Sequence, residues 1–333
     1  MPETPGTPLL EVRDLAMHFP LNASLTRRLR RLPVDVLRAV DGVDLSVMRG
    51  EALGLVGESG CGKSTLGRCI VGLYEPTGGQ VLVEGQALSA KRTPAERRRL
   101  QMVFQDPYSS LNPRMTVHQA LGELLRVHKL VPRNGVDERC RELLDLVGLP
   151  PSALDAYPRQ FSGGQRQRIS IARALALEPE ILIADEPVSA LDVSVQATVL
   201  NLLADLRARL GLTMLFVAHN MSVVRHVCDR VAVMYLGRIV ETAPSDQLFS
   251  DPRHPYTQAL LRAVPRLTPG HATERDAVVG DPPSPVNLPP GCRFNPRCPR
   301  AQEISREVDP PLEYHGELAA ACHFAWSDPG REP

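Results

Sequence analysis

The chain has 333 residues, of which 43% are hydrophobic and 4% aromatic, and its 38 Lys plus Arg balance 38 Asp plus Glu. This apolar content and the zero net charge indicate a globular protein and exclude an intrinsically disordered chain. Neutrality argues against a general nucleic-acid binder, because such proteins need excess positive charge. No apolar run reaches about 18 residues, and the N-terminus lacks a signal-peptide pattern, so we expect a cytosolic protein.

Short apolar runs rich in Val, Leu and Ile alternate with helical patterns along the chain, which predicts an α/β fold with a layered sheet. The runs cover residues 43–48, 52–56, 80–83, 101–104, 181–184, 213–217 and 231–235. Between the fourth and fifth runs the strand pattern is missing, and helical periodicity is clearest over 137–147 and 164–174. We interpret residues from about 105 to 175 as a helical subdomain inserted into the sheet.

Several helix ends carry local signals. Thr93, Pro94 and Glu96 form a capping box with Pro at the first helical position, while Gly148 and Gly211 follow periodic segments as stop signals. Two basic clusters are interpreted as solvated surface. They are Lys91, Arg92, Arg97, Arg98 and Arg99 around the capped helix, and Arg27, Arg28, Arg30 and Arg31 within the irregular stretch 21–37.

Proline becomes frequent from residue 281 onward, with Pro282, Pro283 and Pro285 in close succession. Because proline removes a backbone donor and restricts φ, this stretch excludes regular helix and sheet interior. We therefore predict a domain over residues 1–260 and a separate irregular tail over 261–333.

Residues 57–65 read Gly-Glu-Ser-Gly-Cys-Gly-Lys-Ser-Thr, follow an apolar strand and open a helix, which matches the Walker A pattern in its required context. The glycines let successive N–H groups converge on phosphate oxygens at a helix N-terminus. Lys63 should bridge the β and γ phosphates of ATP, Ser64 should bind Mg²⁺, and Thr65 should reach the α phosphate. The predicted ATP-binding residues here are Gly57, Ser59, Gly60, Cys61, Gly62, Lys63, Ser64 and Thr65.

A second apolar strand, over residues 181–184, ends in Asp185 and Glu186. Carboxylates at the carboxyl end of a strand in an α/β sheet face the ligand-binding edge. We interpret this as a Walker B strand, in which Asp185 holds Mg²⁺ directly or through water. Glu186 is then the candidate catalytic residue that orients and polarises the attacking water.

Three further motifs follow in order: Gln105 after a strand, Phe-Ser-Gly-Gly-Gln over 161–165 before a helix, and His219 after another strand. With both Walker motifs, they make residues 12–261 resemble an ABC transporter ATPase with a P-loop NTPase core. The resemblance implies a head-to-tail dimer in which Ser162, Gly163, Gly164 and Gln165 of one subunit bind ATP held by the other.

By the same resemblance, Gln105 should touch Mg²⁺ or the attacking water and sense a membrane partner. His219 should hydrogen-bond the γ phosphate, and residues 189–192 should communicate between the two sites. Phe19 stands where the family places an aromatic residue against adenine, with His18 as a rival for that role. Asn220 departs from the usual Asp after the switch histidine.

Residues 253–261, 283–285 and 291–298 are similar to the tail of dipeptide and oligopeptide importer ATPases, a branch that nickel importers share. Within this branch, the undivided chain and residues 57–67 and 184–195 look most like the F-type ATP-binding subunit. The resemblance implies an ATPase at the cytoplasmic face of the inner membrane, bound to a second ABC ATPase, identical or different, and to two transmembrane permeases. An extracellular or periplasmic peptide-binding protein would act with them, and no nucleic acid is expected. The alternatives are an importer of nickel or another small solute, and a soluble ABC ATPase acting on nucleic acid or ribosomes.

The tail cysteines leave three interpretations open. Relatives in this branch commonly carry four cysteines here, and some hold a [4Fe-4S] cluster, whereas this chain has Cys292, Cys298 and Cys322 with Ser305 at the remaining position. Zn²⁺ bound by the three thiolates and His323 or His315 is a second possibility. The third is that the cysteines only pack the tail.

Overall fold

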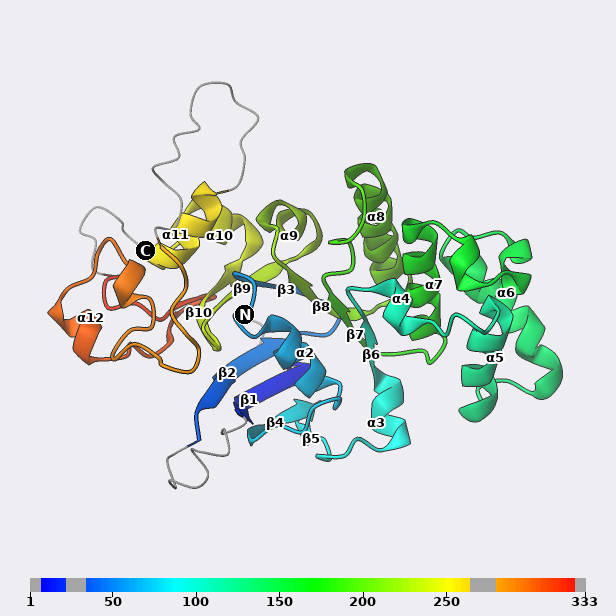
Figure 1. The fold of residues 1–333 in the computed structure, drawn as a ribbon, viewed down its shortest axis with the longest axis horizontal. Helices are drawn as coiled ribbons and strands as arrows, with labels where there is room; N and C mark the ends of the chain where they lie inside the picture. Colours follow the sequence, from blue (N-terminus) through cyan, green and yellow to red (C-terminus); the bar gives the residue numbers. More distant parts are fainter. Residues whose placement is uncertain (1–6, 22–33, 264–279, 327–333) are drawn as a thin grey trace, which may run out of the picture.

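The computed structural model describes residues 7–21, 34–263 and 280–326, so the basic cluster Arg27 to Arg31 lies outside the described residues. The described chain forms two sheets with helices between and around them (Figure 1). The smaller sheet is antiparallel, with order β2-β1-β4-β5. Its strands are β1 (Leu10–Pro20), β2 (Val36–Val47), β4 (Gly78–Val83) and β5 (Gln86–Ala87).

The larger sheet has the order β11-β12-β10-β9-β3-β8-β7-β6. Strands β9, β3, β8, β7 and β6 run parallel, while β10, β12 and β11 add an antiparallel extension. The strands are β3 (Ala52–Val56), β6 (Leu100–Val103), β7 (Ile181–Asp185), β8 (Thr213–Ala218), β9 (Arg230–Tyr235), β10 (Arg238–Pro244), β11 (Glu313–His315) and β12 (Leu318–Ala320). The parallel strands are mostly apolar and buried because both faces of this sheet are covered, and their polar residues, such as Gln101 and Arg230, are few.

Helix α2 (Lys63–Ile70) packs between the two sheets, where Leu66 and Ile70 join a core built from both. On the other face of the larger sheet lie α8 (Val193–Leu210), α9 (Met221–Val227), α10 (Ser245–Ser250) and α11 (Pro255–Arg262), within a second core. The sheet therefore separates two hydrophobic cores.

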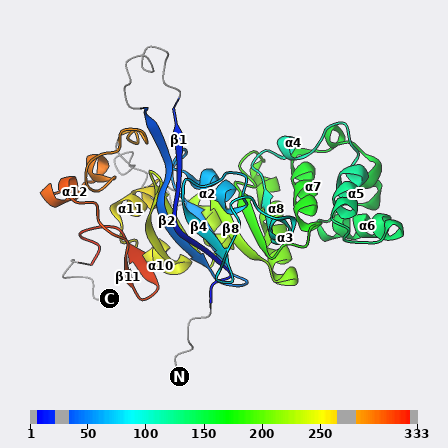
Figure 2. The same ribbon diagram turned by 90° about the horizontal axis from the view of Figure 1, so that it is seen from below.

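Helices α4 (Pro107–Ser110), α5 (Val117–Val127), α6 (Val136–Leu146) and α7 (Gly163–Leu175) stand between β6 and β7 in the chain. Helices α5, α6 and α7 lie at the end of the molecule opposite α12 (Glu303–Glu307) in both ribbon views (Figure 2). Helices α6 and α7 match the predicted periodic segments to within one residue.

The predicted helix ends are confirmed. Thr93 caps α3 (Pro94–Arg99) with a complete capping box to Glu96. Gly211 ends α8 at φ +63°, and Gly148 follows α6 at φ +65°, the left-handed conformation that glycine adopts without strain.

The solvated interpretation of Arg92 is wrong. Arg92 is 4% exposed. Its guanidinium donates to the carbonyls of Cys69 and Ile70, at 3.2 Å each, at the C-terminus of α2. A positive charge there satisfies carbonyls that the helix itself leaves free. The cluster therefore includes a buried capping residue.

The tail is less separate than its prolines suggest. The proline-rich residues 281–290 contain neither helix nor strand, as predicted, but β12 pairs with β10 through Glu241 opposite Ala320. Helix α12 (Glu303–Glu307) and the β11–β12 hairpin also form within the tail. The tail thus completes one end of the larger sheet.

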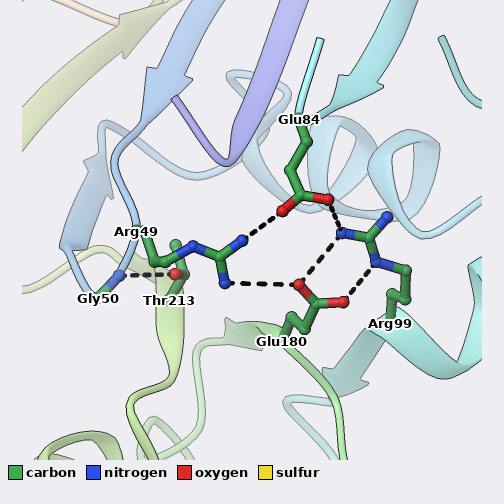
Figure 3. A network of polar contacts seen from close by, with 6 residues as sticks. All are labelled: Arg49, Gly50, Glu84, Arg99, Glu180 and Thr213. Atoms are coloured by element: carbon green, nitrogen blue, oxygen red, sulfur yellow. Dashed lines mark hydrogen bonds and ion pairs between the residues drawn. The ribbon is translucent and has the colours of Figure 1, made fainter. Parts of the chain in front are cut away.

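An ion network joins the two sheets at the amino ends of the parallel strands (Figure 3). Arg99 bonds Glu180 at 2.5 and 3.1 Å and Glu84 at 2.6 Å, and Arg49 bonds Glu84 at 2.5 Å. Arg49, Arg99 and Glu180 stand shortly before β3, β6 and β7, whereas Glu84 lies in the β4–β5 turn. We call these four residues the amino-edge network.

Candidate functional site: a nucleotide cavity at the carboxyl edge of the sheet

The Walker A loop connects β3 to α2 along a path that its neighbours restrict. Gly57 has φ +153°, and a Cβ there would lie 2.2 Å from the carbonyl oxygen of Met234. At Gly62, with φ +111°, a Cβ would lie 2.0 Å from the carbonyl oxygen of Ala39. These positions require glycine because backbone atoms, which cannot move aside, occupy the space of any side chain.

Lys63 is 4% exposed, and its ammonium group donates to the carbonyls of Gly57 at 2.8 Å and Glu58 at 2.9 Å. The Cys61 sulfur is 3.8 Å from the same nitrogen, and burial raises the pKa of that thiol, so the thiol stays neutral. The lysine ammonium group is therefore held inside the loop by two backbone carbonyls.

A cavity of about 540 Å³ opens beside this loop at the carboxyl ends of the parallel strands, within the usual size range of small-molecule sites. It brings together predicted residues from β1, from the Walker A loop and the start of α2, and from loops that follow strands of the larger sheet. Its lining is Phe19, Leu37, Ala39, Ser59, Gly60, Gly62, Lys63, Ser64, Thr65, Gln105, Glu186 and His219.

Asp185 is absent from this lining, but its carboxylate accepts a hydrogen bond at 2.8 Å from the hydroxyl of Ser64, which lines the cavity. The residue is 1% exposed, and burial raises the pKa of its carboxyl group. A hydroxyl and a carboxylate at this separation are oxygen ligands of the kind Mg²⁺ takes when it also binds phosphates. These two residues fit a Mg²⁺ ion bound with the nucleotide.

Glu186 receives two polar neighbours from other loops. The amide of Gln105 donates to its carboxylate at 3.2 Å, and Nδ1 of His219 lies 3.0 Å from the same oxygen. Glu186 has φ +45°, an uncommon conformation for a residue other than glycine. Backbone strain of this kind persists where surrounding contacts hold a side chain in a functional position.

Phe19 and His18 are adjacent on β1, but their side chains have different neighbours. Phe19 lines the cavity, and its ring meets Tyr74 edge-on with centroids 5.7 Å apart. The His18 ring instead lies 2.7 Å from the Asp41 carboxylate. Of the two, Phe19 is the residue that lines the cavity.

The signature residues 162–165 lie away from this cavity. Ser162 caps α7, its hydroxyl accepting from the Gln165 amide, and both residues are exposed. A Cβ on Gly164 would lie 2.3 Å from a methyl group of Val195, so glycine allows α7 and α8 to approach closely. Within the described chain, Ser162 and Gln165 are exposed at the start of α7, whereas Gly164 is buried against α8.

The loops that follow the catalytic strands are also ordered by local contacts. The Ser189 hydroxyl donates to the backbone carbonyl of Glu186 at 3.1 Å, which ties the start of the 189–192 segment to the backbone of that residue. Asn220 caps α9 by accepting from the Ser222 amide at 2.9 Å, a role that Asp would fill equally well.

Three residues beside the site were missed by the sequence analysis: Tyr235, Tyr256 and Arg297. The Tyr256 hydroxyl accepts from the Glu58 amide at 2.8 Å, and Arg297 binds the Glu58 carboxylate with two bonds of 2.8 Å. Arg297 belongs to a recognisable tail motif, but no sequence signal indicates that it contacts the Walker A loop, more than 200 positions earlier.

The three tail cysteines are free thiols that line one small hollow with His254, Ser305 and His323. Burial raises the pKa of Cys292 to about 11, so its thiol is protonated at neutral pH. In the described residues no group of three or more His, Cys, Asp or Glu is arranged to hold a metal ion. The iron-sulfur and zinc hypotheses thus find no support.

The fold and the cavity define a P-loop nucleotide-binding domain with an inserted helical subdomain. The family described as "ABC transporter" matches residues 40–189, and the family described as "Oligopeptide/dipeptide transporter, C-terminal region" matches residues 240–304. Two relatives are the oligopeptide transport ATP-binding protein AppF of Bacillus subtilis, 49% identical, and the dipeptide transport ATP-binding protein DppF of Escherichia coli, 48% identical. The alignments cover 95% of this chain in both cases, and 95% and 94% of the relatives.

Solved structures agree. The chain resembles cbiO1 of Clostridium perfringens, part of an ABC transporter complex, with a TM-score of 0.62 and 28% identity over 74% of this chain and 92% of the other. It also resembles a dimeric ATP-binding cassette bound to ADP and Pi in a post-hydrolysis state, with a TM-score of 0.61 and 27% identity over 71% and 98% of the two chains. The chain belongs to the ATP-binding proteins of the ABC transporter family, and is therefore an ATPase that uses ATP and Mg²⁺.

As a member of this family, the chain acts as one subunit of an ATPase pair that serves membrane permeases. None of the helices in the described residues is both long and apolar enough to cross a bilayer.

Proposed function

We propose that this chain is the ATP-hydrolysing subunit of an importer for dipeptides or oligopeptides. The observation that carries the proposal is the joining of a Walker-type cavity to a C-terminal region of the oligopeptide/dipeptide type. Relatives that align along nearly the whole chain are named for oligopeptide and dipeptide transport, which favours peptides over nickel or another small solute. The neutral charge and this C-terminal region also weigh against a soluble ABC ATPase acting on nucleic acid or ribosomes.

In this proposal the nucleotide lies along the cavity with its base against Phe19 and its phosphates in the Walker A loop. Lys63 leaves the loop carbonyls for the β and γ phosphates, and backbone N–H groups at the start of α2 add the favourable end of the helix dipole. Ser64 and Asp185 would hold Mg²⁺, which would supply positive charge against the phosphates.

Hydrolysis then depends on positioning and charge stabilisation, with no covalent enzyme intermediate. Glu186 accepts a hydrogen bond from the attacking water and orients it toward the γ phosphate. Without nucleotide, Gln105 and His219 both contact the Glu186 carboxylate. When nucleotide binds, Gln105 would turn to Mg²⁺ or the attacking water. His219 would turn to the γ phosphate.

The exposed Ser162 and Gln165 support a head-to-tail dimer. Ser162, Gly163, Gly164 and Gln165 at the N-terminus of α7 would complete the site of a second ATPase subunit, identical or different, when its γ phosphate is present. Closure on ATP would drive two permeases at the cytoplasmic face of the membrane, with an extracellular or periplasmic binding protein delivering the peptide. The segment 106–114, beside the sensing residue Gln105, is the candidate contact with the permeases.

The proposal assigns residues 1–260 to the ATPase domain, about 105–175 to its helical subdomain and 261–333 to the importer-type tail. It requires ATP and Mg²⁺ as ligands, and the tail cysteines take no part in it.

The test is ATP hydrolysis by the chain assembled in membranes with its permeases and partner ATPase. Binding protein loaded with a peptide should stimulate hydrolysis, and Glu186→Gln should abolish the stimulated rate while ATP still binds. Glu142→Gln, which removes an exposed carboxylate on α6, is the matched control and should leave the rate unchanged. Stimulation by binding protein loaded with Ni²⁺, and not by binding protein loaded with peptide, would show that the imported solute is nickel. Stimulation by ribosomes or DNA without permeases would overturn the importer assignment.

A further inference from the structure

Glu58 stands inside the Walker A loop, but its side chain faces away from the nucleotide cavity. Its neighbours Ser59 and Gly60 line the cavity, whereas the Glu58 carboxylate turns to the C-terminal tail and receives two parallel hydrogen bonds from Arg297, each 2.8 Å long. Such a bidentate pair fixes orientation as well as distance. The loop is thus bound on its outer side by a residue of the tail.

The pair is shielded from water. The Arg297 side chain is 5% exposed and that of Glu58 24%, and the guanidinium also donates to the Tyr235 hydroxyl at 3.3 Å. The Glu58 backbone is held from the same side, because its amide donates to the Tyr256 hydroxyl at 2.8 Å. Both the side chain and the backbone of Glu58 therefore depend on residues outside the Walker motif.

The tail segment that carries Arg297 is itself firmly anchored. Phe294, 2% exposed, packs against Tyr235 and Tyr256 with ring centroids 5.3 and 5.4 Å away. The Asn295 amide bonds the carbonyls of Pro290 and Cys292 at 2.7 and 2.8 Å, and Arg293 bonds the Leu236 carbonyl and Asp41. Arg297 thus projects from a buried, hydrogen-bonded turn.

Glu58, the residue that Arg297 binds, also supports Lys63 through its backbone. The Glu58 carbonyl accepts from Lys63 at 2.9 Å and from the Cys61 amide at 3.3 Å. Rotation or displacement of Glu58 would move this carbonyl, and with it the resting position of the Lys63 ammonium group and the turn over Gly60 and Cys61.

We infer that Arg297 is a positioning residue for ATP binding, by which the C-terminal tail sets the shape of the Walker A loop through Glu58. The inference rests on the proposed role of the Walker A loop in binding phosphate. Contacts from the tail hold the Walker A loop in the shape that binds ATP, so changes in the tail should alter ATP affinity.

The experiment measures the Kd of MgATP for the full-length chain by calorimetry, in a Glu186→Gln background that keeps ATP intact and well below the unfolding temperature of every variant. Arg297→Met and Glu58→Gln should each weaken ATP binding about tenfold, equal to about 1.4 kcal/mol. Because the two residues act as a unit, the double variant should be no weaker than either single one. Arg297→Lys keeps the charge but loses the bidentate geometry, so it should fall between the wild type and Arg297→Met.

Asp309→Asn is the matched control, since it breaks the tail ion pair with Arg238, which does not contact the Walker A loop. It should change thermal stability without changing the Kd. An unchanged Kd in Arg297→Met, or multiplicative losses in the double variant, would overturn the inference. Lys63→Ala separates the two proposals: if it leaves ATP affinity intact, the Walker A assignment falls, whereas if it abolishes binding while Arg297→Met has no effect, only the inference about the tail falls.

Discussion

The amino-edge network and the junction between tail and Walker A loop both join distant segments through arginine and glutamate, yet they differ in burial. In the network Arg49 and Glu84 are 58% and 50% exposed, whereas at the junction Arg297 is 5% exposed. Water and salt screen the first set of charges, while the second set sits among aromatic rings. The same residue types therefore provide a weak surface tie in one region and a strong constraint in the other.

The largest expected difference between the two regions comes from replacing one glycine in each with alanine. Gly57→Ala places a Cβ 2.2 Å from a backbone oxygen, so we expect the Walker A loop to shift and ATP affinity to fall by about 100-fold or more. Gly50, beside the amino-edge network, also has positive φ, at +75°, but nothing lies within 4 Å of its Cβ position. Gly50→Ala should cost about 1 kcal/mol of stability from backbone strain alone, with ATP affinity unchanged.

Calorimetric titration and thermal unfolding of both glycine variants supply the measurements. Equal losses of ATP affinity at the two positions would show that packing beside the Walker A loop is not the cause.

The free energy of unfolding should also depend on pH, because of Glu241 on β10, the strand that pairs with the tail. Glu241 is 1% exposed, and burial raises the pKa of its carboxyl group from 4.5 to about 7, although it accepts from the amides of Arg253 and His254. The folded state thus holds this proton more tightly than the unfolded state. The associated stability is full below pH 4.5 and is lost as pH rises through 7, by up to about 3 kcal/mol.

Denaturant unfolding of wild type and Glu241→Gln across this pH window tests the prediction. The free energy of unfolding of the wild type minus that of Glu241→Gln should decrease from pH 4.5 to 7. A difference that does not change with pH would mean that Glu241 has an ordinary pKa in the folded protein.

Loss of the junction arginine should also lower global stability. Arg297→Met leaves a partly buried carboxylate without its partner, and we expect a loss of about 2 kcal/mol, below the usual value for fully buried pairs because Glu58 retains some exposure. Adding Glu58→Gln should recover part of the loss, since no uncompensated charge then remains. Guanidinium unfolding measures both variants, and a double variant less stable than Arg297→Met would contradict the argument.

The smallest effect is expected at the amino-edge network. Arg99→Met removes contacts with Glu180 and Glu84, yet these groups are 31 to 50% exposed, so the loss should be about 1 kcal/mol or less. It should shrink further as NaCl rises from about 0.05 to about 0.5 M, because screening weakens the wild-type contacts. Urea unfolding at both salt concentrations checks this, and a salt-independent loss would indicate a packing role for the Arg99 stem instead.

The nucleotide site was predictable because its chemistry is written in contiguous motifs. The Walker A loop needs glycines, a lysine and hydroxyls in a fixed order, and the Walker B strand ends in its carboxylates, so local sequence indicated which residues would line the cavity. Parallel strands place their carboxyl ends at one edge, which is why Lys63, Gln105, Glu186 and His219 meet there.

Other features depend on contacts between distant segments and left no such signal. Arg92 carries the sequence signature of a surface cluster, but it is buried where it caps α2. Leu318–Ala320 is too short for a strand pattern, and it becomes β12 because β10 presents an edge to pair with.

The sequence by itself determined the fold class, the five parallel strands with the two periodic helices α6 and α7, and the residues available for ATP chemistry, because these follow from hydrophobic periodicity and from motifs within a few residues. Only the tertiary structure decided which charges are buried, that the tail completes the larger sheet, and that Arg297 holds Glu58. Those outcomes depend on how segments far apart in the chain exclude water from one another, and burial controls the strength of every charged contact involved.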